Sequence, residues 1–171
     1  MKYQIREIDK ESFKELKLVT ERCMETVLET IPEFQGDTTI AKESLSNFSF
    51  EQMSNMIQKD FTDPNKRIMV AVAGDELIGH AIYSVKKDDD NVLYGFCYSR
   101  YVEPSYRRQG VASMLMENAI EWFRQEKVSY LYAQTHITNI KLQGLFKKFG
   151  FVLSGPFKGR WEYYILKKDM E

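Results

Sequence analysis

Apolar and polar positions along the chain follow a strand period and a helix period in turn. Residues 3–8 largely alternate with a period of two, which predicts a first strand. From about residue 11 to residue 30 the apolar positions recur at helical spacing, and this helix is expected to end before Pro32, since proline disfavours helical geometry in the preceding residue. A polar stretch from Gln35 to Asn47 is expected to lead into a second helix over about residues 50–61.

The rest of the chain predicts a meander of strands followed by alternating helices and strands. Strands are expected over 67–72, 77–84, 92–102 and 129–135, near 151–153 and near 161–166, and helices over 110–126 and 139–149. Gly74-Asp75 is typical of a tight hairpin turn. No repeat or interdomain linker interrupts the series, so we expect residues 1–171 to form one α/β domain.

Composition and charge narrow the function. The chain has 171 residues, of which 43% are apolar, and this is enough for a buried core. Its formal net charge of −1 disfavours general binding to nucleic acids or to anionic membranes. Arg107-Arg108 and Lys147-Lys148 remain suited to a small anion.

The remaining bulk features indicate a cytoplasmic protein that holds no metal. Cys23 and Cys97 fit no metal-ligand spacing, and two free thiols are favoured over one disulfide. The first ten residues lack the apolar core of a signal peptide. No apolar run approaches the roughly 20 residues that span a bilayer.

A short basic turn between a strand and an amphipathic helix carries the most specific chemistry. The apolar face of that helix is predicted to consist of Val111, Leu115, Ala119 and Trp122, with Ala112 and Phe123. The first N–H groups of a helix lack partners within it, and its N-terminus is electropositive. Gly110 and Ala112 would let a phosphate approach these N–H groups, while Arg107 and Arg108 add positive charge. The turn is therefore a candidate diphosphate site, and the alternative is an ordinary strand–helix turn with solvated arginines.

Two motifs resemble the GNAT superfamily of N-acetyltransferases. The family signature, Arg/Gln-x-x-Gly-x-Gly/Ala after a strand that ends Val-x-Pro, is matched by Val102, Pro104, Arg107, Gly110 and Ala112. A second family segment is matched by Asn139-x-x-Leu142-x-x-Leu145-Phe146-x-x-Phe149-Gly150-Phe151. The order of elements fits from Ile5 to Leu166. The resemblance implies a mixed, mostly antiparallel sheet of about six to seven strands, flanked by about four helices and splayed between the fourth and fifth strands.

The resemblance also implies acetyl-CoA as co-substrate and assigns parts of the chain to it. Residues of about 92–151 would form the acetyl-CoA-binding core, and residues of about 9–61 the helical acceptor side. Backbone groups of Val102 would hold the pantetheine, N–H groups of residues 107–113 the diphosphate, and Asn139 the pantetheine amide, although Asn139 also suits a helix N-cap. The cofactor-binding residues predicted in this way are Tyr101, Val102, Arg107, Arg108, Gln109, Gly110, Val111, Ala112, Ser113, Asn139 and Phe146.

The catalytic groups are less well defined by the sequence. Many relatives have a tyrosine at position 146 that protonates the leaving thiolate, and Phe146 has no hydroxyl to do so. Candidates for the base that deprotonates the amine are Glu103, Tyr98, Tyr101 and His136. For Glu103 the alternative is a solvent-facing side chain, and His80 is interpreted as a packing residue.

The acceptor is expected between the first two helices, within 25–47, and the loop after Phe151. Glu25, Glu29, Glu33 and Asp37 would form an acidic rim that attracts a small cationic amine, or else a solvated helix face. Aromatic residues within 155–161 would wall the pocket or pack at a strand end. The alternatives in function are an acetyltransferase for protein N-termini or lysines and a non-catalytic acyl-CoA-binding module. Similar proteins are often homodimers, but the sequence locates no interface.

Overall fold

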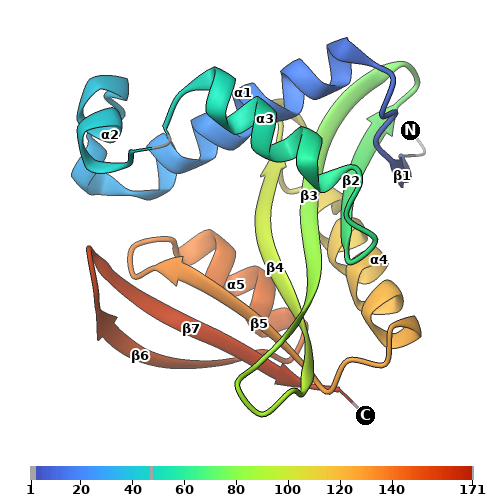
Figure 1. The fold of residues 1–171 in the computed structure, drawn as a ribbon, viewed down its shortest axis with the longest axis vertical. Helices are drawn as coiled ribbons and strands as arrows, with labels where there is room; N and C mark the ends of the chain where they lie inside the picture. Colours follow the sequence, from blue (N-terminus) through green and yellow to red (C-terminus); the bar gives the residue numbers. More distant parts are fainter. Residues whose placement is uncertain (1–2, 47, 171) are drawn as a thin grey trace.

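A seven-stranded sheet in the order β1-β2-β3-β4-β5-β7-β6 lies at the centre of the computed structural model, which describes residues 3–46 and 48–170 (Figure 1). The strands are β1 (Gln4–Glu7), β2 (Lys66–Ala73), β3 (Glu76–Lys87), β4 (Leu93–Val102), β5 (Tyr130–His136), β6 (Val152–Lys158) and β7 (Glu162–Asp169). The helices are α1 (Phe13–Thr30), η1 (Pro32–Phe34), α2 (Thr38–Ser44), α3 (Phe50–Asp60), η2 (Pro104–Tyr106), α4 (Val111–Gln125) and α5 (Ile140–Lys148). The predicted α/β class and the number of strands are confirmed.

One predicted loop is wrong. The polar stretch from Gln35 onward contains the short helix α2, which begins at an Asp37 cap whose carboxylate accepts the Thr39 N–H at 2.6 Å. Only Ala41 of α2 is buried, so no apolar stripe marked this helix in the sequence. Asn47, at the end of the predicted stretch, lies outside the described residues.

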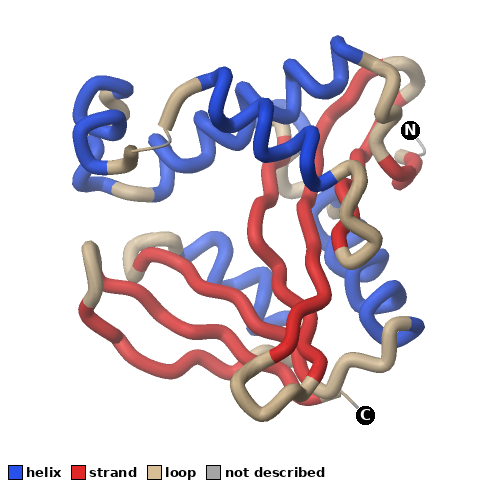
Figure 2. The backbone as a smooth tube through the Cα atoms, viewed as in Figure 1, coloured by secondary structure: helices blue, strands red, loops and turns tan. Residues whose placement is uncertain are grey.

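The sheet splays between β4 and β5, as the family resemblance implied. The two strands pair in parallel only where Tyr94, Gly95 and Phe96 face Tyr130, Leu131 and Tyr132. Beyond these pairs β4 stays on β3 up to Val102, while β5 stays on β7 up to His136. Figure 2 shows the two strands meeting at one end and diverging toward the other. The backbone edges of β4 and β5 that face each other are therefore left open at their C-terminal ends.

Helices cover both faces of the sheet and leave the splay between them. One buried cluster joins α4 and α5 to the sheet through residues such as Leu115, Phe123 and Phe146. A second joins α1 and α3 to the opposite face through Val19 and Ile57. In the part of the chain that the structure describes, no helix has the length and apolar character that crossing a bilayer requires.

Gly95 lies where β4, β5 and α4 meet, and a side chain there has no room. A Cβ atom at this position would lie 2.6 Å from Cδ1 of Phe123 and 2.7 Å from Cδ2 of Leu131, both in buried residues. We expect Gly95→Ala to lower the free energy of unfolding by about 1–3 kcal/mol, because the added methyl group would push the Phe123 ring and the Leu131 side chain away from β4. Chemical denaturation measures this, and Gly144→Ala in α5, where no atom lies within 4 Å of the new Cβ, is the matched control. Equal stability of the two variants would contradict the predicted crowding.

Candidate active site

The turn between β4 and α4 is held in place by its own side chains. Gln109 accepts a hydrogen bond from the Tyr3 hydroxyl and donates one from Nε2 to the Ser105 carbonyl at 2.8 Å. Arg108 has a φ of +64° and Gly110 a φ of +87°, so the backbone turns sharply into the helix. Gly110 suits this left-handed position, and the Gln109 contacts link the turn to β1.

The N-terminus of α4 presents a row of backbone donors without protein acceptors. The first helical bond of α4 runs from Met114 N–H to the Gly110 carbonyl at 3.0 Å. Among the described residues, none of the backbone N–H groups from Arg108 to Ser113 donates to a protein atom. No heavy atom lies within 4 Å of a Cβ built on Gly110, so the space in front of these donors is open. Open N–H groups at an electropositive helix end fit a diphosphate.

We call this row of donors the α4 cradle (backbone 108–113), and Lys148 places a positive charge beside it. Lys148, the last residue of α5, donates from Nζ to the Ser113 hydroxyl at 3.1 Å and so joins the end of α5 to the start of α4. The exposed Arg108 forms no ion pair within residues 3–46 and 48–170. Arg107 instead points toward α1, where Nη2 lies 3.4 Å from the Glu29 carboxylate, and its Nε donates to the Val102 carbonyl at 2.8 Å. Arg107 therefore fixes the turn, and the contribution of its charge to phosphate binding stays a prediction.

Tyr101 and Glu103, at the end of β4, are bound to α1. The Tyr101 hydroxyl lies 3.2 Å from Glu25 and 3.4 Å from Glu103. Burial, with the charges of Glu103 and Glu25, raises the pKa of Tyr101 to about 12, so its hydroxyl is protonated at neutral pH. Glu103 forms an ion pair with Arg22 of α1, a side chain that is 5% exposed. The expectation that Glu103 faces solvent is therefore wrong, since its carboxylate is turned toward a buried cation.

The other two candidate bases differ in their surroundings. The Tyr98 hydroxyl lies 3.6 Å from the Met56 sulfur, and burial raises its pKa, so Tyr98 is poorly suited to accept a proton. His136, at the end of β5, has Nδ1 2.8 Å from the Thr138 hydroxyl and Nε2 3.2 Å from the Glu33 carboxylate. An imidazole held between a hydroxyl and a carboxylate is arranged for proton transfer. Of the four candidate bases, His136 has the contacts that suit the role best.

The second motif is placed partly at the site and partly in the core. Asn139 caps α5, with its side-chain oxygen accepting the Leu142 N–H at 3.3 Å, so the N-cap interpretation is confirmed and a contact with pantetheine stays a prediction. Phe146 is 1% exposed and its ring centre lies 4.6 Å from that of Phe151. A direct contact between Phe146 and a cofactor likewise stays a prediction. His80 is fully buried, and burial lowers its pKa to about 3, which confirms a packing role.

Three carboxylates form a row across the mouth of the splay. Glu25 contacts Tyr101 at the end of β4, Glu29 contacts Arg107, and Glu33 contacts His136 at the end of β5. The sequence predicted these three residues as part of an acidic rim, but only the fold shows that they lie over the ends of both strands. The fourth predicted member of the rim, Asp37, is instead the N-cap of α2.

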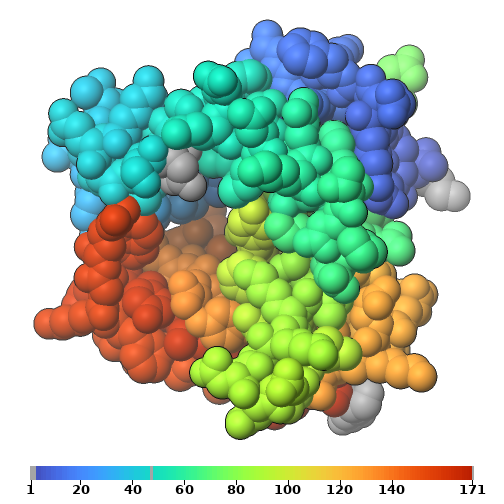
Figure 3. Space-filling view, viewed as in Figure 1, coloured from blue at the N-terminus to red at the C-terminus, as the bar shows by residue number. Residues whose placement is uncertain are grey.

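The loop between β6 and β7 closes the outer side of this region. The Trp161 ring packs edge-on against Phe34 of η1 at 5.9 Å, and the Arg160 guanidinium donates to the Ser44 carbonyl of α2. Figure 3 shows a hollow between the blue-to-cyan segment of α1 and α2, the red loop and the yellow-green β4. Of the two predicted roles for the aromatic residues within 155–161, Trp161 bounds the hollow, whereas Phe157 packs on Tyr163 at the strand end.

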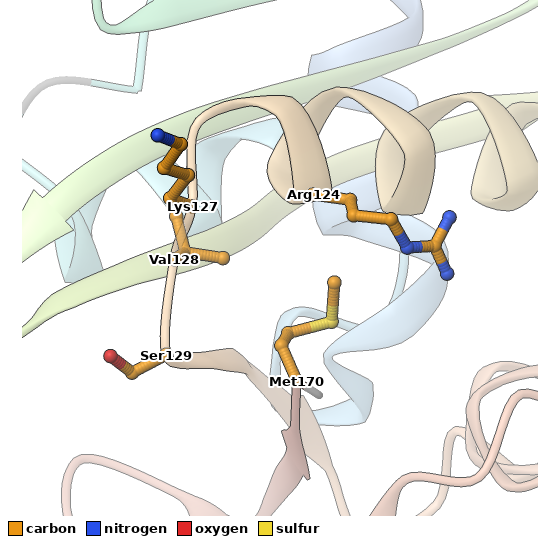
Figure 4. Close-up of a pocket in the computed structure, with 5 residues that line it drawn as sticks. All are labelled: Arg124, Lys127, Val128, Ser129 and Met170. Atoms are coloured by element: carbon orange, nitrogen blue, oxygen red, sulfur yellow. The ribbon is translucent and has the colours of Figure 1, made fainter.

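A separate cavity lies at the opposite end of α4. Its volume is about 310 Å³, and Figure 4 shows Met170 pointing toward the last turn of α4, from which Arg124 extends. The lining residues are Arg124, Lys127, Val128, Ser129 and Met170. None of them was predicted as a site residue, and the full length of α4 separates this cavity from Gly110. The described residues contain no group of three or more His, Cys, Asp or Glu side chains placed to hold a metal ion.

Solved structures with the same fold include several acetyltransferases. The PaiA N-acetyltransferase from Thermoplasma acidophilum, in complex with coenzyme A, is 18% identical, with a TM-score of 0.76 over 99% of this chain and 100% of that one. The ribosomal-protein-alanine N-acetyltransferase from Brucella melitensis is 19% identical, with a TM-score of 0.72 over 98% and 99%. The putative acetyltransferase yncA from Salmonella typhimurium, with acetyl-CoA, is 16% identical, with a TM-score of 0.69 over 99% and 94%. At these identities the likeness establishes the fold.

Comparison of the sequence with models of protein families shows which family the chain belongs to. A search of curated proteins finds no match. The model of the acetyltransferase (GNAT) family matches residues 28–151, a range that makes up most of the chain and includes both motifs, the α4 cradle and the splayed strands. The chain therefore belongs to the acetyltransferase (GNAT) family.

Proposed function

We propose that the protein transfers the acetyl group of acetyl-CoA to the primary amine of a small cationic molecule. The observation that carries this proposal is the row of Glu25, Glu29 and Glu33 over the open ends of β4 and β5. Several negatively charged carboxylates grouped at the entrance of a hollow attract a cation and raise its local concentration. The amine is thereby drawn to the place where a thioester held between the two strands would react.

The start of α4 and the open edge of β4 support the binding of acetyl-CoA. The α4 cradle offers unpartnered N–H groups to the diphosphate, with Lys148 and Arg108 beside it. The open edge of β4 offers backbone groups to the pantetheine, in the manner of an added strand. Three structures of the same fold contain coenzyme A or acetyl-CoA, which supports the same ligand here.

The proposed reaction is direct attack of the amine on the thioester. The acceptor ammonium displaces Glu33 from Nε2 of His136 and gives its first proton to that nitrogen, while Thr138 holds Nδ1. The nitrogen lone pair then forms a bond to the carbonyl carbon, and the C–S bond breaks with its electron pair remaining on the sulfur. The nitrogen loses its second proton to water. The products are an acetylated amine and CoA.

A protein acceptor is the alternative within the same chemistry. Structures of this fold include ribosomal-protein-alanine N-acetyltransferases and a NatC complex bound to a peptide. The contacts of Trp161 with Phe34 and of Arg160 with Ser44 narrow the outer side of the hollow, which favours a small acceptor over an extended peptide.

Thermal unfolding followed by thiol release tests the proposal. Saturating acetyl-CoA at about 100 times its Kd should add about 2.7 kcal/mol to the stability, while ATP and NAD should add much less. Polyamines, aminoglycosides, amino sugars and peptides with free N-termini would then be compared as acceptors by release of the CoA thiol. Release with the small amines supports the proposal, and release only with peptides favours the alternative. Binding without release for any acceptor would indicate a non-catalytic acyl-CoA-binding module.

The row of Glu25, Glu29 and Glu33 leads to a prediction for the KM of the amine acceptor. We expect Glu29→Gln to raise the KM of a cationic amine about fivefold with little change in kcat, because it removes one attracting charge and leaves Arg107 without its partner. Steady-state kinetics at low ionic strength measure this. Glu21→Gln is the matched control, since Glu21 lies two turns earlier on α1 and pairs with Lys17 at 3.8 Å. Equal KM values in the two variants would show that the row does not guide the amine.

A further inference from the structure

Arg100 of β4 turns its guanidinium toward the face of the sheet covered by α4 and α5, where its charge acts on the buried Tyr83 hydroxyl and Cys97 thiol. It follows the last residues of β4 that pair with β5, so it lies in the splayed part of the strand. Its guanidinium carbon lies 5.1 Å from the centre of the Phe146 ring of α5, and its Nη2 lies 4.0 Å from the Met116 sulfur of α4. Both neighbours are almost fully buried. A permanently charged side chain thus lies between α4 and α5, behind the gap in the sheet.

The Nε–H of Arg100 has no hydrogen-bond acceptor in the part of the chain that the structure describes. This atom is buried and forms no hydrogen bond with any described residue. The hydroxyl oxygen of Thr135, on the β5 side of the same gap, is also buried and without a partner in the described structure. A buried donor on a charged group that lacks an acceptor is costly, and such groups are commonly satisfied by a ligand or an ordered water. The two strands therefore bring an unsatisfied cationic donor and an unsatisfied hydroxyl to the floor of the splay.

The path of a bound CoA leads toward this donor. The α4 cradle and Lys148 set the diphosphate at the point where the start of α4 meets the end of α5. From there a pantetheine arm that enters the gap between β4 and β5 runs along the two helices that Arg100 contacts. The sulfur at the end of the arm would then lie within the splayed stretch that contains Arg100 and Val102.

Thioester aminolysis creates a negative charge on that sulfur. When the amine nitrogen bonds to the carbonyl carbon and the C–S bond breaks, the electron pair stays on sulfur as a thiolate. Phe146, at the position adjacent to Arg100, has no hydroxyl that could donate a proton to it. A nearby cation lowers the pKa of a thiol and so stabilises the thiolate without a proton transfer.

We propose that the Nε–H of Arg100 binds the CoA sulfur and stabilises the thiolate as it leaves. This rests on the proposed acetyl-CoA-dependent function. Arginine keeps its proton throughout, so its contribution is a hydrogen bond and a charge that strengthen as the sulfur becomes negative. The first proton lost by the ammonium goes to His136 and the second to water, and the thiolate takes a proton from water after CoA is released.

The ultraviolet absorbance of the thiolate, followed as a function of pH in bound CoA, tests the proposal without any acceptor. Free thiols have a pKa of about 8.5, and we expect wild-type protein to hold about tenfold more of its CoA as thiolate at neutral pH than free CoA contains. Desulfo-CoA gives the protein background. Arg100→Met should remove this excess while CoA still binds, because methionine fits among the apolar neighbours. Arg124→Met, at the far end of α4, is the matched control and should titrate as wild type.

A second variant separates a chemical role from a packing role. With an acceptor in hand, Arg100→Met should lower kcat about 10- to 100-fold with the Kd of acetyl-CoA unchanged. Adding Phe146→Tyr to Arg100→Met should restore part of the loss, since a hydroxyl then stands beside the same sulfur. Equal thiolate content in wild type and Arg100→Met would overturn the proposal for Arg100 alone. An excess of thiolate that depends on Arg100, in a protein that acetylates no amine, would instead uphold the contact and overturn the proposed function.

Discussion

Replacing Gly110 with glutamate is expected to raise the Kd for acetyl-CoA at least about 100-fold while the protein remains folded. The new carboxylate would stand in front of the N–H groups of the α4 cradle, where the diphosphate would otherwise bind, and like charges in such a site cost several kcal/mol. No atom lies within 4 Å of the new Cβ, so the change does not disturb packing. Isothermal calorimetry, or the loss of the thermal shift with acetyl-CoA, measures the effect.

Gly110→Ala is the matched control for backbone strain. Gly110 has a φ of +87°, which costs any residue with a side chain roughly 1–2 kcal/mol, and alanine bears this cost without bulk or charge. Gly110→Ala should therefore be less stable than wild type yet keep most of its affinity. Similar affinities in the alanine and glutamate variants would mean that the diphosphate binds elsewhere.

The cradle could be predicted from the sequence because its chemistry is local. A strand, a basic turn and a helix that opens with Gly110 and Ala112 place unpartnered N–H groups at one end of an electropositive helix, whatever surrounds them. The order of strands and helices was predictable for the same reason, since each element shows its own period. The splay followed from the family resemblance, and the structure locates where pairing ends, at Phe96 and Tyr132.

Contacts between distant segments were not predictable. Glu103 meets Arg22, 81 residues away, and Arg107 meets Glu29, 78 residues away. In a sequence with 24 basic and 25 acidic residues, nothing local indicates which opposite charges will pair. The same holds for Arg100, which reads as one more polar residue on a strand until α4 and α5 enclose it.

These distant contacts give α1 two roles. Its polar face carries Glu25 and Glu29 to the mouth of the splay, where the proposed acceptor would enter. Its buried face carries Arg22, which is bound to the end of β4 through Glu103 and to β3 through the Leu77 carbonyl at 2.9 Å. The acceptor side and the strand edge proposed to hold the thioester are thus fixed to each other in part by a largely buried ion pair.

Removing that ion pair should therefore have a large effect on stability. Arg22 is 4% exposed, and its Nε and Nη1 atoms have no partner among the described residues, so Glu103 is the only carboxylate that pairs with this cation there. We expect Glu103→Ala to lower the free energy of unfolding by about 3 kcal/mol, near the low end for a broken buried pair, since the Glu103 side chain is 28% exposed. Urea denaturation followed by circular dichroism measures the loss.

Two further variants show whether the loss of stability comes from the buried, unpaired charge of Arg22. Glu121→Ala removes the partner of Arg124 in a pair whose side chains are 58% and 60% exposed, and should cost less than about 1 kcal/mol. Arg22→Met combined with Glu103→Ala should recover most of the stability that Glu103→Ala alone loses, because no unpaired cation is then buried. If the double variant were as unstable as Glu103→Ala, the carboxylate would stabilise the turn by another route. Recovery would instead mean that Glu103 serves to hold the end of β4 against α1, which leaves the proton transfer to His136.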